Sequence, residues 1–481
     1  MRRDGKIYQR LDMSGYKEIS DFVLKYDYCC GCGVCAGVCP QDALQIRFNE
    51  SGEYRPYLVG SCTDCGLCSM VCPFVNGNPD EDDIGCMHFA GVSGTKHTSE
   101  TGYYLSCLMG HSTVDGHQKN GASGGMATWM LETLLRLGEV ERVACVRPRS
   151  GGHPLFEFVI CQNIKEVRAC SRSSYYPVEI SSIVRQILSD RKRYAVIGLP
   201  CVCKALRLCA QANPRLRDRV KYILGLTCGH GLSSHFSEYV FGMAGGKPCE
   251  LHALSFRVKS VQRCLAECGT VLVGRNAEGE YERQITWSQG VWPLFKNRYF
   301  TPLACDLCDD VFAECADATF MDAWLPEYAR DREGHSIVLI RNPAIRSILQ
   351  EHVRIGCALA PIDVGRVVQS QKGALRCKRA ELPVRMEIFR RLINACIPRR
   401  SHVPGRSVGF VQRLLVEAQW RIARRSSTEW RQADRRIDTF RQRTRYLERH
   451  LLWLNCFMMI RRSPLSAIKK MVRKVCKLLP M

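Results

Sequence analysis

Two absences in this 481-residue sequence limit the class of protein to which it can belong. The first residues, MRRDGKIYQRLDMSG, lack the apolar core of a secretory signal, so we expect a reducing, cytoplasmic compartment in which disulfides are rare. No apolar run reaches the roughly 18–20 residues that a membrane-spanning helix requires. A disulfide-tied secreted fold and a spanning helix are therefore not expected. The length suits two or three domains with buried cores.

What the chain has in excess is cysteine. It contains 29 cysteines, whereas its 46% hydrophobic and 24% charged residues are ordinary for a soluble globular protein. Many of these cysteines recur at tight, repeated spacings. In a reducing compartment, such spacings favour metal binding over disulfide formation.

Two cysteine runs share one pattern, Cys-x2-Cys-x2-Cys-x3-Cys-Pro. They read CCGCGVCAGVCP from residue 29 and CTDCGLCSMVCP from residue 62, and the first run has one spare thiol, Cys30, which we interpret as a buried bystander. This is the bacterial ferredoxin spacing, in which the fourth cysteine of each run ligates the other [4Fe–4S] cluster. Zinc sites would instead use two CxxC pairs or Cys/His sets. The expected ligands are Cys29, Cys32, Cys35 and Cys72 for one cluster and Cys62, Cys65, Cys68 and Cys39 for the other.

After the polar linker NGNPDEDD, the chain takes on an α/β pattern. The segment GASGGMATWMLETLLRLGEVERVACV predicts a Gly-rich turn, an amphipathic helix and a strand. Free amides at that helix start would favour a phosphate, and a simple tight turn is the alternative. A second β-loop-α unit is predicted in RYAVIGLPCVCKALR and a third strand in KYILGLTCGHG.

Seven blocks in this order resemble the family of coenzyme F-420 hydrogenase/dehydrogenase beta subunits, in its bacterial form with two N-terminal ferredoxin clusters. They are GASGG, SRSSYYPV, GLPCVCKAL, LTCGHGLSS, SFRVK, RYFTPLACDLC and ADATFMDAW, within about residues 25–380. The resemblance implies an FAD-dependent iron–sulfur oxidoreductase. Such a protein would pass electrons between a two-electron small-molecule carrier, deazaflavin-like or unidentified, and [4Fe–4S] clusters or ferredoxin. Some members are associated with bacterial polysaccharide synthesis.

The resemblance also implies where the flavin would bind. The expected cofactor-binding residues are Gly121, Ser123, Gly124, Gly125, Ser174, Tyr175, Arg257 and Lys259. The sequence departs from the family pattern nearby, because the usual lysine of the Ser-Lys-Tyr segment is replaced by serine or displaced to Arg172. Leu199 and Val202 stand where the family has threonine and glutamine. These departures put the usual substrate in doubt, and no catalytic residue is assigned.

Four cysteines of the body are expected to bind a third cluster, because the carboxyl ends of neighbouring strands meet at one crevice. They are Cys201, Cys228, Cys305 and Cys308, with Cys203 and Cys315 as substitutes. Structural zinc or free core thiols are the alternatives. The cysteines expected to serve only in packing are Cys107, Cys145, Cys161, Cys357 and Cys396. For His230 a hydrogen-bonded loop position is as well supported as a flavin contact.

The chain becomes strongly basic near its end. Residues 401–481 carry 19 Lys/Arg against 5 Asp/Glu, which accounts for +14 of the total charge of +22. The body is therefore nearly ordinary, and no nucleic-acid binding is expected. The sequence predicts two or three basic helices, and LLWLNCFMMI is too short to span a bilayer but suits a membrane interface. Docking of these helices on the body is the alternative.

We therefore expect an α+β protein of four parts. They are a ferredoxin-like domain with two [4Fe–4S] clusters at 20–85, the FAD-binding N-terminal part of an α/β body at 95–180, its C-terminal part with the third cluster at 181–385, and a basic amphipathic helical tail at 404–481. The expected partner is a redox protein, either ferredoxin or a partner enzyme, and the tail is expected to allow peripheral contact with the inner face of the membrane. The alternative function is an electron-transfer adaptor without its own substrate.

Overall fold

The protein is represented by a computed structural model that describes residues 19–149, 151–260, 262–353, 355–393 and 408–462. Two parts of the sequence-based expectations lie outside these residues. They are Cys396 and the part of the basic tail beyond residue 462, including a third tail helix.

The centre of the molecule is one mixed sheet of eight strands. Its order is β15-β5-β14-β13-β9-β8-β6-β7, and the four strands β13, β9, β8 and β6 run parallel while each of their outer neighbours is antiparallel. The strand bounds are β5 Ser106–Ser112, β6 Arg142–Pro148, β7 Phe156–Cys161, β8 Tyr194–Gly198, β9 Val220–Leu226, β13 Ala318–Asp322, β14 Ser336–Ile340 and β15 Cys357–Pro361. The sheet takes strands from both 95–180 and 181–385, so these two ranges together form one folding unit.

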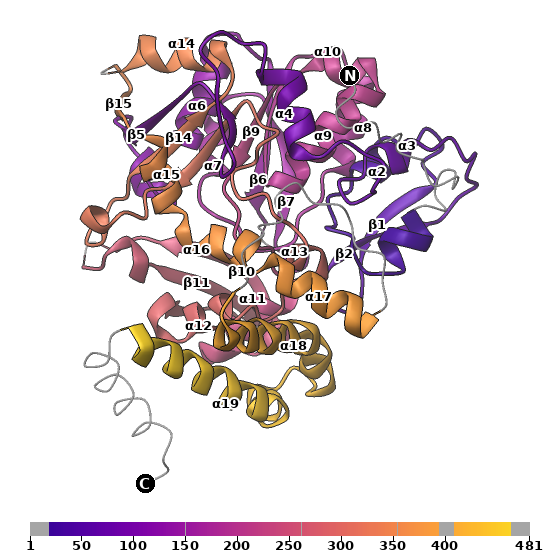
Figure 1. The fold of residues 1–481 in the computed structure, drawn as a ribbon, viewed down its shortest axis with the longest axis vertical. Helices are drawn as coiled ribbons and strands as arrows, with labels where there is room; N and C mark the ends of the chain where they lie inside the picture. Colours follow the sequence, from indigo (N-terminus) through magenta and orange to yellow (C-terminus); the bar gives the residue numbers. More distant parts are fainter. Residues whose placement is uncertain (1–18, 150, 261, 354, 394–407, 463–481) are drawn as a thin grey trace.

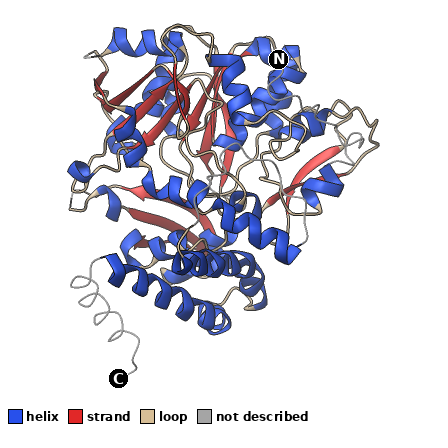
Figure 2. Cartoon of the chain, viewed as in Figure 1, coloured by secondary structure: helices blue, strands red, loops and turns tan. Residues whose placement is uncertain are grey.

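Helices cover both faces of this sheet, as Figures 1 and 2 show. One face packs α6 (Met126–Arg136) and α14 (Pro343–His352) against apolar residues of the inner strands. The other packs α8 (Ser181–Ser189) and α9 (Pro200–Ala212). The inner strands read as apolar runs because both of their faces are buried. The helix and strands expected around GASGG, GLPCVCK and GLTCGHG are present as α6–β6, β8–α9 and β9.

The N-terminal cysteine runs form a small unit against α8 and α9. Its elements are η1 Ile19–Leu24, α2 Val34–Gly37, β1 Leu44–Phe48, β2 Tyr54–Leu58, α3 Leu67–Met70 and α4 Glu81–Phe89. The expected linker NGNPDEDD is not wholly a loop, which corrects that expectation. The Asp80 side chain accepts from the Asp83 amide (2.9 Å) and the Asp83 side chain accepts from the Asp80 amide (3.2 Å). This capping box starts α4 inside the acidic stretch.

A second, antiparallel sheet lies beside the large one. It comprises β10 Leu251–Val258, β11 Gly269–Asn276 and β12 Gly279–Thr286. The remaining elements are β3 Lys96–Thr98, β4 Gly102–Tyr104, α5 His117–Asn120, α7 Ile164–Ala169, α10 Pro214–Arg219, α11 Ser234–Met243, η2 Pro248–Glu250, η3 Leu265–Glu267, η4 Trp287–Gln289, α12 Val291–Lys296, α13 Leu303–Asp306, η5 Pro326–Tyr328, α15 Val364–Ser370, α16 Lys372–Leu375, η6 Arg376–Ala380 and α17 Leu382–Ile393.

The basic tail docks on the body instead of projecting from it. Helices α18 (Phe410–Gln432) and α19 (Ile437–Arg462) pack beneath the small sheet and α11 (Figure 1). Their apolar side chains join one buried cluster with that sheet, namely Leu415, Ala418, Ile422, Trp430, Phe440, Leu447, Leu451 and Leu454. The alternative of docking thus accounts for the described part of the tail, and nothing supports the expected membrane contact.

Charged residues of α18 also reach the N-terminal unit. Arg424 pairs with Asp27 at 3.0 Å, and Arg431 pairs with Glu50. The ring of Trp420 packs edge-on against Phe389 of α17, which in turn contacts Tyr28 beside the first cysteine run. The described stretches of the chain contain no helix with the length and apolar character needed to cross a membrane.

Truncating Trp430 is expected to destabilise the whole protein. This side chain is fully buried, and its indole Nε1 donates to Glu238 Oε2 at 3.0 Å. Trp430→Ala should lower the free energy of unfolding by about 3–5 kcal/mol, measured by urea denaturation. The matched control is Trp453→Ala, because Trp453 is 60% exposed on α19 and should change stability by less than about 0.5 kcal/mol. Equal behaviour of the two variants would contradict docking of the tail.

Candidate functional site

Cys29, Cys32, Cys35 and Cys72, called group 1, lie together at the contact between the N-terminal unit and the body. Burial raises the pKa of Cys35 well above its usual value, and nearby Cys29 and Cys72 raise it further. Burial likewise raises the pKa of Cys72 to about 12, with Cys29 adding to the effect. Cys32 adjoins Cys35. The last cysteine of the second run is thus placed among the thiols of the first, as the ferredoxin spacing predicts.

The remaining four thiols of the two runs, called group 2, also lie together. Cys39, Cys62, Cys65 and Cys68 line one pocket, together with apolar neighbours that include Leu44 and Leu58. The fourth cysteine of the first run therefore faces the thiols of the second. Cys62 and Cys65 are exposed, so group 2 reaches the protein surface, whereas the cysteines of group 1 are buried or half-buried.

The two runs fold alike because each has a glycine at the same position, directly after its second ligand cysteine. Gly33 and Gly66 precede α2 and α3 with φ of 81° and 75°, a left-handed conformation that L side chains rarely adopt. Backbone amides then turn towards sulfur. Gly31 N donates to Cys29 Sγ (3.4 Å), and Asp64 N donates to Cys62 Sγ (3.3 Å) at the same offset. Amide–sulfur bonds of this kind tune the reduction potential of an iron–sulfur cluster.

The four body cysteines also come together and are called group 3. Cys201 lies in the first turn of α9, Cys228 follows β9, Cys305 lies in α13 and Cys308 follows that helix. Burial raises the pKa of Cys228 to about 12, and the nearby Cys201 and Cys308 add to this rise. Cys305 adjoins Cys228 and Cys308 in turn. The carboxyl end of β9 and the start of α9 thus bring distant cysteines to one place.

Group 3 has a buried cation that sequence analysis did not single out. The ammonium of Lys378, 2% exposed, donates to Cys308 Sγ (3.1 Å) and to the carbonyl of Asp310 (2.5 Å). Burial alone would lower the pKa of Lys378, but Cys308 and Cys228 hold it above its usual value. The amide of Gly231 donates to Cys305 Sγ (3.2 Å). A four-thiolate cluster carries net negative charge, so this donor set fits an iron–sulfur cluster.

Cys30 lies between groups 1 and 3 and is not an isolated thiol. A hydrogen bond with Cys30, together with burial, raises the pKa of Cys201 well above its usual value. On its other side, Cys30 lies close enough to Cys32 for the two thiols to interact electrostatically. No local signal in the sequence gives this contact, because it joins residues about 170 positions apart.

The substitute ligands are engaged elsewhere. Cys203 Sγ donates to the carbonyls of Gly198 (3.6 Å) and Leu224 (3.5 Å), within the sheet core. Cys315 is fully buried beside Cys203, and Cys107 and Cys357 are buried singly in the core. The alternative of free core thiols therefore suits these positions better than it suits group 3.

The Gly-rich turn that opens α6 presents free amides at a buried position. Ser123, Gly124 and Gly125 are buried, and their amides have no hydrogen-bond partner among the described residues. Gly124 is required for close packing, since a Cβ there would meet Gly110 O at 2.7 Å. The Ser123 hydroxyl is not free, because it donates to His335 O (2.6 Å). Buried amides at a helix start fit a phosphate group.

The Phe-Arg-x-Lys block lies next to this turn. Lys259 Nζ donates to Ser123 O (2.7 Å) and also to the carbonyls of Gln118 and Glu333. Burial and the charge of Arg257 lower the pKa of Lys259 to about 8. Lys259 therefore stabilises the turn through these hydrogen bonds and is not a free cation for a substrate. Its expected role as a cofactor-binding residue is thereby limited to holding the turn in place.

Arg257 is buried beside Tyr175 and Cys268. Its Nη1 pairs with Asp322 and its guanidinium lies over the Trp324 ring at 5.2 Å, but Nε and Nη2 lack an acceptor of suitable geometry. Tyr175 lies beside this guanidinium. Ser174 has no polar partner among the described residues. A buried guanidinium with free N–H groups fits an anionic or carbonyl-bearing ligand.

Aromatic rings connect Arg257 with group 3. Tyr175 contacts Phe295 (ring centroids 5.8 Å apart), and Phe295 contacts His230 at 4.1 Å. His230 follows Cys228 closely in sequence and its Nε2 has no acceptor or donor partner in the described structure. Burial lowers the pKa of His230 well below its usual value, so the imidazole is neutral. The cofactor-binding candidates and the cysteine groups thus form one continuous region.

Comparison with known families agrees with the resemblance inferred from sequence. The model "Coenzyme F420 hydrogenase/dehydrogenase, beta subunit N-term" matches residues 107–185, and its C-terminal counterpart matches residues 191–361. A third model, "4Fe-4S dicluster domain", matches residues 22–73. Together the first two cover just over half of the chain. The third supports two iron–sulfur clusters in the part of the chain that holds both cysteine runs.

Individual relatives are distant. One of the subunits of the F(420)H(2) dehydrogenase from Methanosarcina mazei is 23% identical over 214 residues, which are 43% of this chain and 54% of that protein. The chain thus spans about half the length of this curated relative. A chain of the F420-reducing [NiFe] hydrogenase complex from Methanosarcina barkeri aligns with a TM-score of 0.46 at 18% identity, covering 64% of this chain and 99% of that one.

Proposed function

This chain belongs to the family of coenzyme F420 hydrogenase/dehydrogenase beta subunits, and from that premise we propose that it is an FAD-dependent iron–sulfur oxidoreductase. It would move electrons between a two-electron carrier and a partner protein. One observation carries the proposal. Group 3 lies next to group 1, with Cys30 between them. Ring contacts through His230, Phe295 and Tyr175 also connect group 3 with Arg257.

The proposed route runs from the interior to the surface. The Gly-rich turn would hold a flavin, which would supply the conversion between two-electron and one-electron chemistry. The thiols of groups 3, 1 and 2 would hold iron–sulfur clusters in that order between the turn and the surface. Cys35 and Cys72 of group 1 both adjoin Cys68 of group 2, which supports a short step between the last two clusters.

The residues around the turn would divide the work of holding the cofactor. The amides of Ser123, Gly124 and Gly125 would bind its diphosphate, since these donors are buried and unused. Arg257 would donate its free Nε and Nη2 to an anionic or carbonyl group, either of the cofactor or of the carrier. Lys259 would keep the turn in shape through its three carbonyl bonds.

A partner protein would dock where group 2 meets solvent. Cys62 and Cys65 are exposed there, and the exposed apolar side chains Leu58 and Val59 lie at the end of β2 beside them. Exposed apolar residues next to a redox centre suit a transient protein contact. A ferredoxin or a partner enzyme is the expected class.

The alternative, an electron-transfer adaptor without its own substrate, is favoured by one observation. Lys259 donates to three backbone carbonyls, so it is not available to an acidic carrier. The site therefore has one fewer cation for such a carrier than the family pattern implies. An adaptor would lack bound flavin while retaining iron.

Anaerobic purification followed by addition of NADH, NADPH, reduced deazaflavin or reduced ferredoxin tests the proposal. We expect about one flavin and roughly twelve irons per chain, four per cubane, and bleaching of the flavin by one two-electron donor followed by reduction of the clusters. Roughly twelve irons without flavin would instead indicate the electron-transfer adaptor. Roughly eight irons without flavin would indicate that the protein carries only the two clusters of groups 1 and 2.

Arg257→Met is expected to weaken binding of the flavin or of its donor by about 10- to 100-fold, because a charge-assisted hydrogen bond contributes roughly 1.5–3 kcal/mol. Flavin content after dialysis and the concentration of donor needed for half-maximal bleaching measure the effect. Arg275→Met is the matched control, since Arg275 lies exposed on neighbouring β11. Unchanged flavin and donor binding in Arg257→Met, with iron content retained, would contradict the assigned role.

A further inference from the structure

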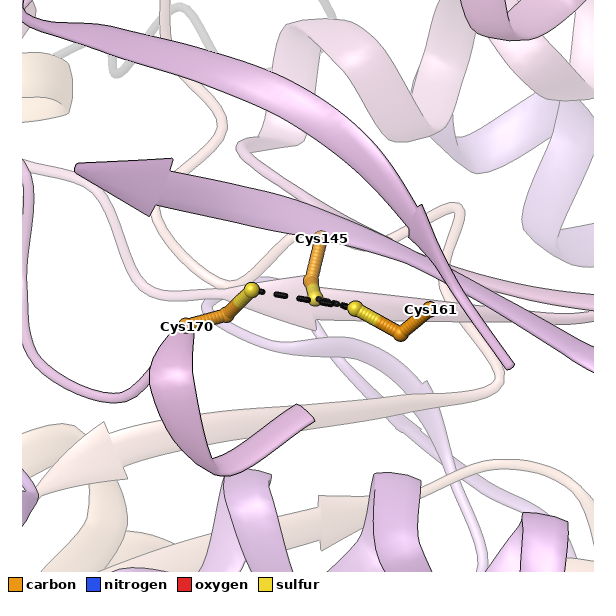
Figure 3. Close-up of side chains that lie close together, drawn as sticks. All are labelled: Cys145, Cys161 and Cys170. Carbon is orange, nitrogen blue, oxygen red and sulfur yellow. Dashed lines mark hydrogen bonds between the residues drawn. The ribbon is translucent and has the colours of Figure 1, made fainter. Parts of the chain in front are cut away.

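Three cysteines outside groups 1 to 3 converge at one edge of the large sheet. Cys145 lies on β6, Cys161 ends β7 and Cys170 caps α7. Figure 3 shows the three sulfurs directed at one another from the two strands and the helix end. The Sγ atoms of Cys145 and Cys161 are 3.6 Å apart, those of Cys161 and Cys170 are 3.7 Å apart, and all three lie within 4.8 Å. Packing alone does not require three thiols at one point.

The strand register argues against a disulfide between Cys145 and Cys161. Cys145 is paired with Val159 and Cys161 with Val143, so the two cysteines are diagonal neighbours on one face of the β6–β7 ladder. Diagonal neighbours are about 7–8 Å apart, whereas a disulfide requires Cα atoms roughly 4.4–6.8 Å apart. Cys161 moreover sits between two partners and cannot pair with both.

The sulfur spacing suits one metal ion. Zinc binds thiolates at about 2.3 Å in a tetrahedral arrangement, which puts neighbouring sulfurs about 3.8 Å apart. The observed 3.6 Å and 3.7 Å lie close to that separation. An iron–sulfur cubane holds its thiolates around eight atoms and therefore keeps them further apart. A soft three-thiolate set selects zinc or copper(I) over magnesium, calcium or manganese.

The surroundings of the three thiols contain a nearby cation and leave room for a fourth metal ligand. Cys145 and Cys161 are buried among apolar residues of the sheet, whereas Cys170 is half-buried and leaves one side open to water. Arg147 lies close enough to interact electrostatically with Cys161 and Cys170. Three thiolates and one Zn²⁺ carry a net charge of −1, and Arg147, which also pairs with Glu157 at 2.7 Å, is a cation near that charge. A water molecule at the open side would be the fourth ligand.

We propose that Cys145, Cys161 and Cys170 bind one Zn²⁺ ion, in a site separate from the iron–sulfur centres. Binding displaces three thiol protons and breaks no covalent bond between heavy atoms. The ion would fasten β7, the last strand in the sheet order, and α7 to the inner strand β6. An edge strand has ladder partners on one side only, so such a crosslink would hold the strand least secured by the sheet.

Metal analysis of the full-length, cluster-loaded protein tests this site. Wild-type protein, exposed to Zn²⁺ and then washed with a weak chelator, should retain about one zinc per chain, and X-ray absorption should show three sulfurs at about 2.3 Å. Cys170→Ser and Cys161→Ala should each lose that zinc and keep the wild-type iron content. Bound zinc should also raise the melting temperature of wild-type protein, and this shift should vanish in Cys170→Ser.

Cys357→Ala is the matched control, because Cys357 is buried in the same apolar cluster and has no thiol neighbour among the described residues. It should retain the zinc even if it is less stable. The proposal is overturned if wild-type protein retains no zinc, or if Cys170→Ser retains as much as wild type. It is also overturned if bound zinc rises only as iron falls, which would place the zinc in the iron–sulfur sites, or if copper(I) binds at these thiols and zinc does not.

Discussion

Replacing Cys39 and Cys65 together by serine is expected to remove one cluster, whereas replacing Cys39 and Cys35 together is expected to remove two. Cys39 lines a pocket with Cys62, Cys65 and Cys68, although it belongs to the first run. The first pair therefore shares a cluster and the second pair does not. Starting from roughly twelve irons, the variants should retain about eight and about four irons, since each cubane holds four.

Iron and acid-labile sulfide per chain, measured after anaerobic purification, distinguish these outcomes. Cys86→Ser serves as the control because Cys86 is exposed on α4 and belongs to none of the three groups. If each run held its own cluster, the result would be inverted. The Cys39/Cys35 variant would then lose one cluster and the Cys39/Cys65 variant would lose two.

Cys305→Ser is expected to separate the flavin from the N-terminal clusters. Loss of group 3 should leave about eight of twelve irons and the full flavin content. The flavin should still bleach with its donor, because Arg257 and the Gly-rich turn are intact. Reduction of groups 1 and 2 should then fail on the time scale on which the wild-type clusters follow the flavin. Stopped-flow spectra under anaerobic conditions record both steps.

The control for this experiment is Cys203→Ser. Cys203 is near group 3 but donates to two backbone carbonyls, and a serine hydroxyl can make the same bonds. It should therefore keep about twelve irons and normal electron transfer. Loss of four irons in Cys203→Ser, with none lost in Cys305→Ser, would show that Cys203, and not Cys305, is a ligand of the third cluster.

The sequence is most informative where the structure depends on near neighbours. The ferredoxin runs have a fixed local spacing, and their turns need glycine at Gly33 and Gly66, so the exchange of Cys39 and Cys72 could be predicted. Group 3 could be predicted because strand ends converge, even though its members are far apart in the chain. The family membership predicted from the ordered blocks is confirmed by the matching models.

Contacts between distant segments were not predictable in the same way. Nothing in the sequence near Lys378 marks it as the cation beside Cys308, and Cys30 gave no sign of its contact with Cys201. Cys145 and Cys161 were expected to serve only in packing, because their convergence with Cys170 depends on the β6–β7 register. The individual ligand and flavin assignments stay predictions until they are measured.

The tail shows why charge alone misleads. Its arginines suggested a membrane surface, yet the apolar positions of α18, such as Ile422 and Trp430, are buried in one cluster, where Trp430 packs against Tyr239 of α11, Phe300 and Phe440 of α19. Both interpretations require an amphipathic helix, so its pattern cannot separate them. The acidic partners Asp27 and Glu50 lie near the other end of the chain, which makes the pairing invisible to local inspection.

The ion pair between Asp27 and Arg424 joins residues 397 positions apart, and this separation constrains how the protein is made. At about 5–20 residues per second, a ribosome needs on the order of tens of seconds to pass from one residue to the other. During that interval the cysteine runs are outside the exit tunnel without the helix that later secures them. Delivery of iron and sulfide to the nascent N-terminal unit can therefore precede closure by the last helices. The speed of translation between these two residues then sets how long that opportunity lasts.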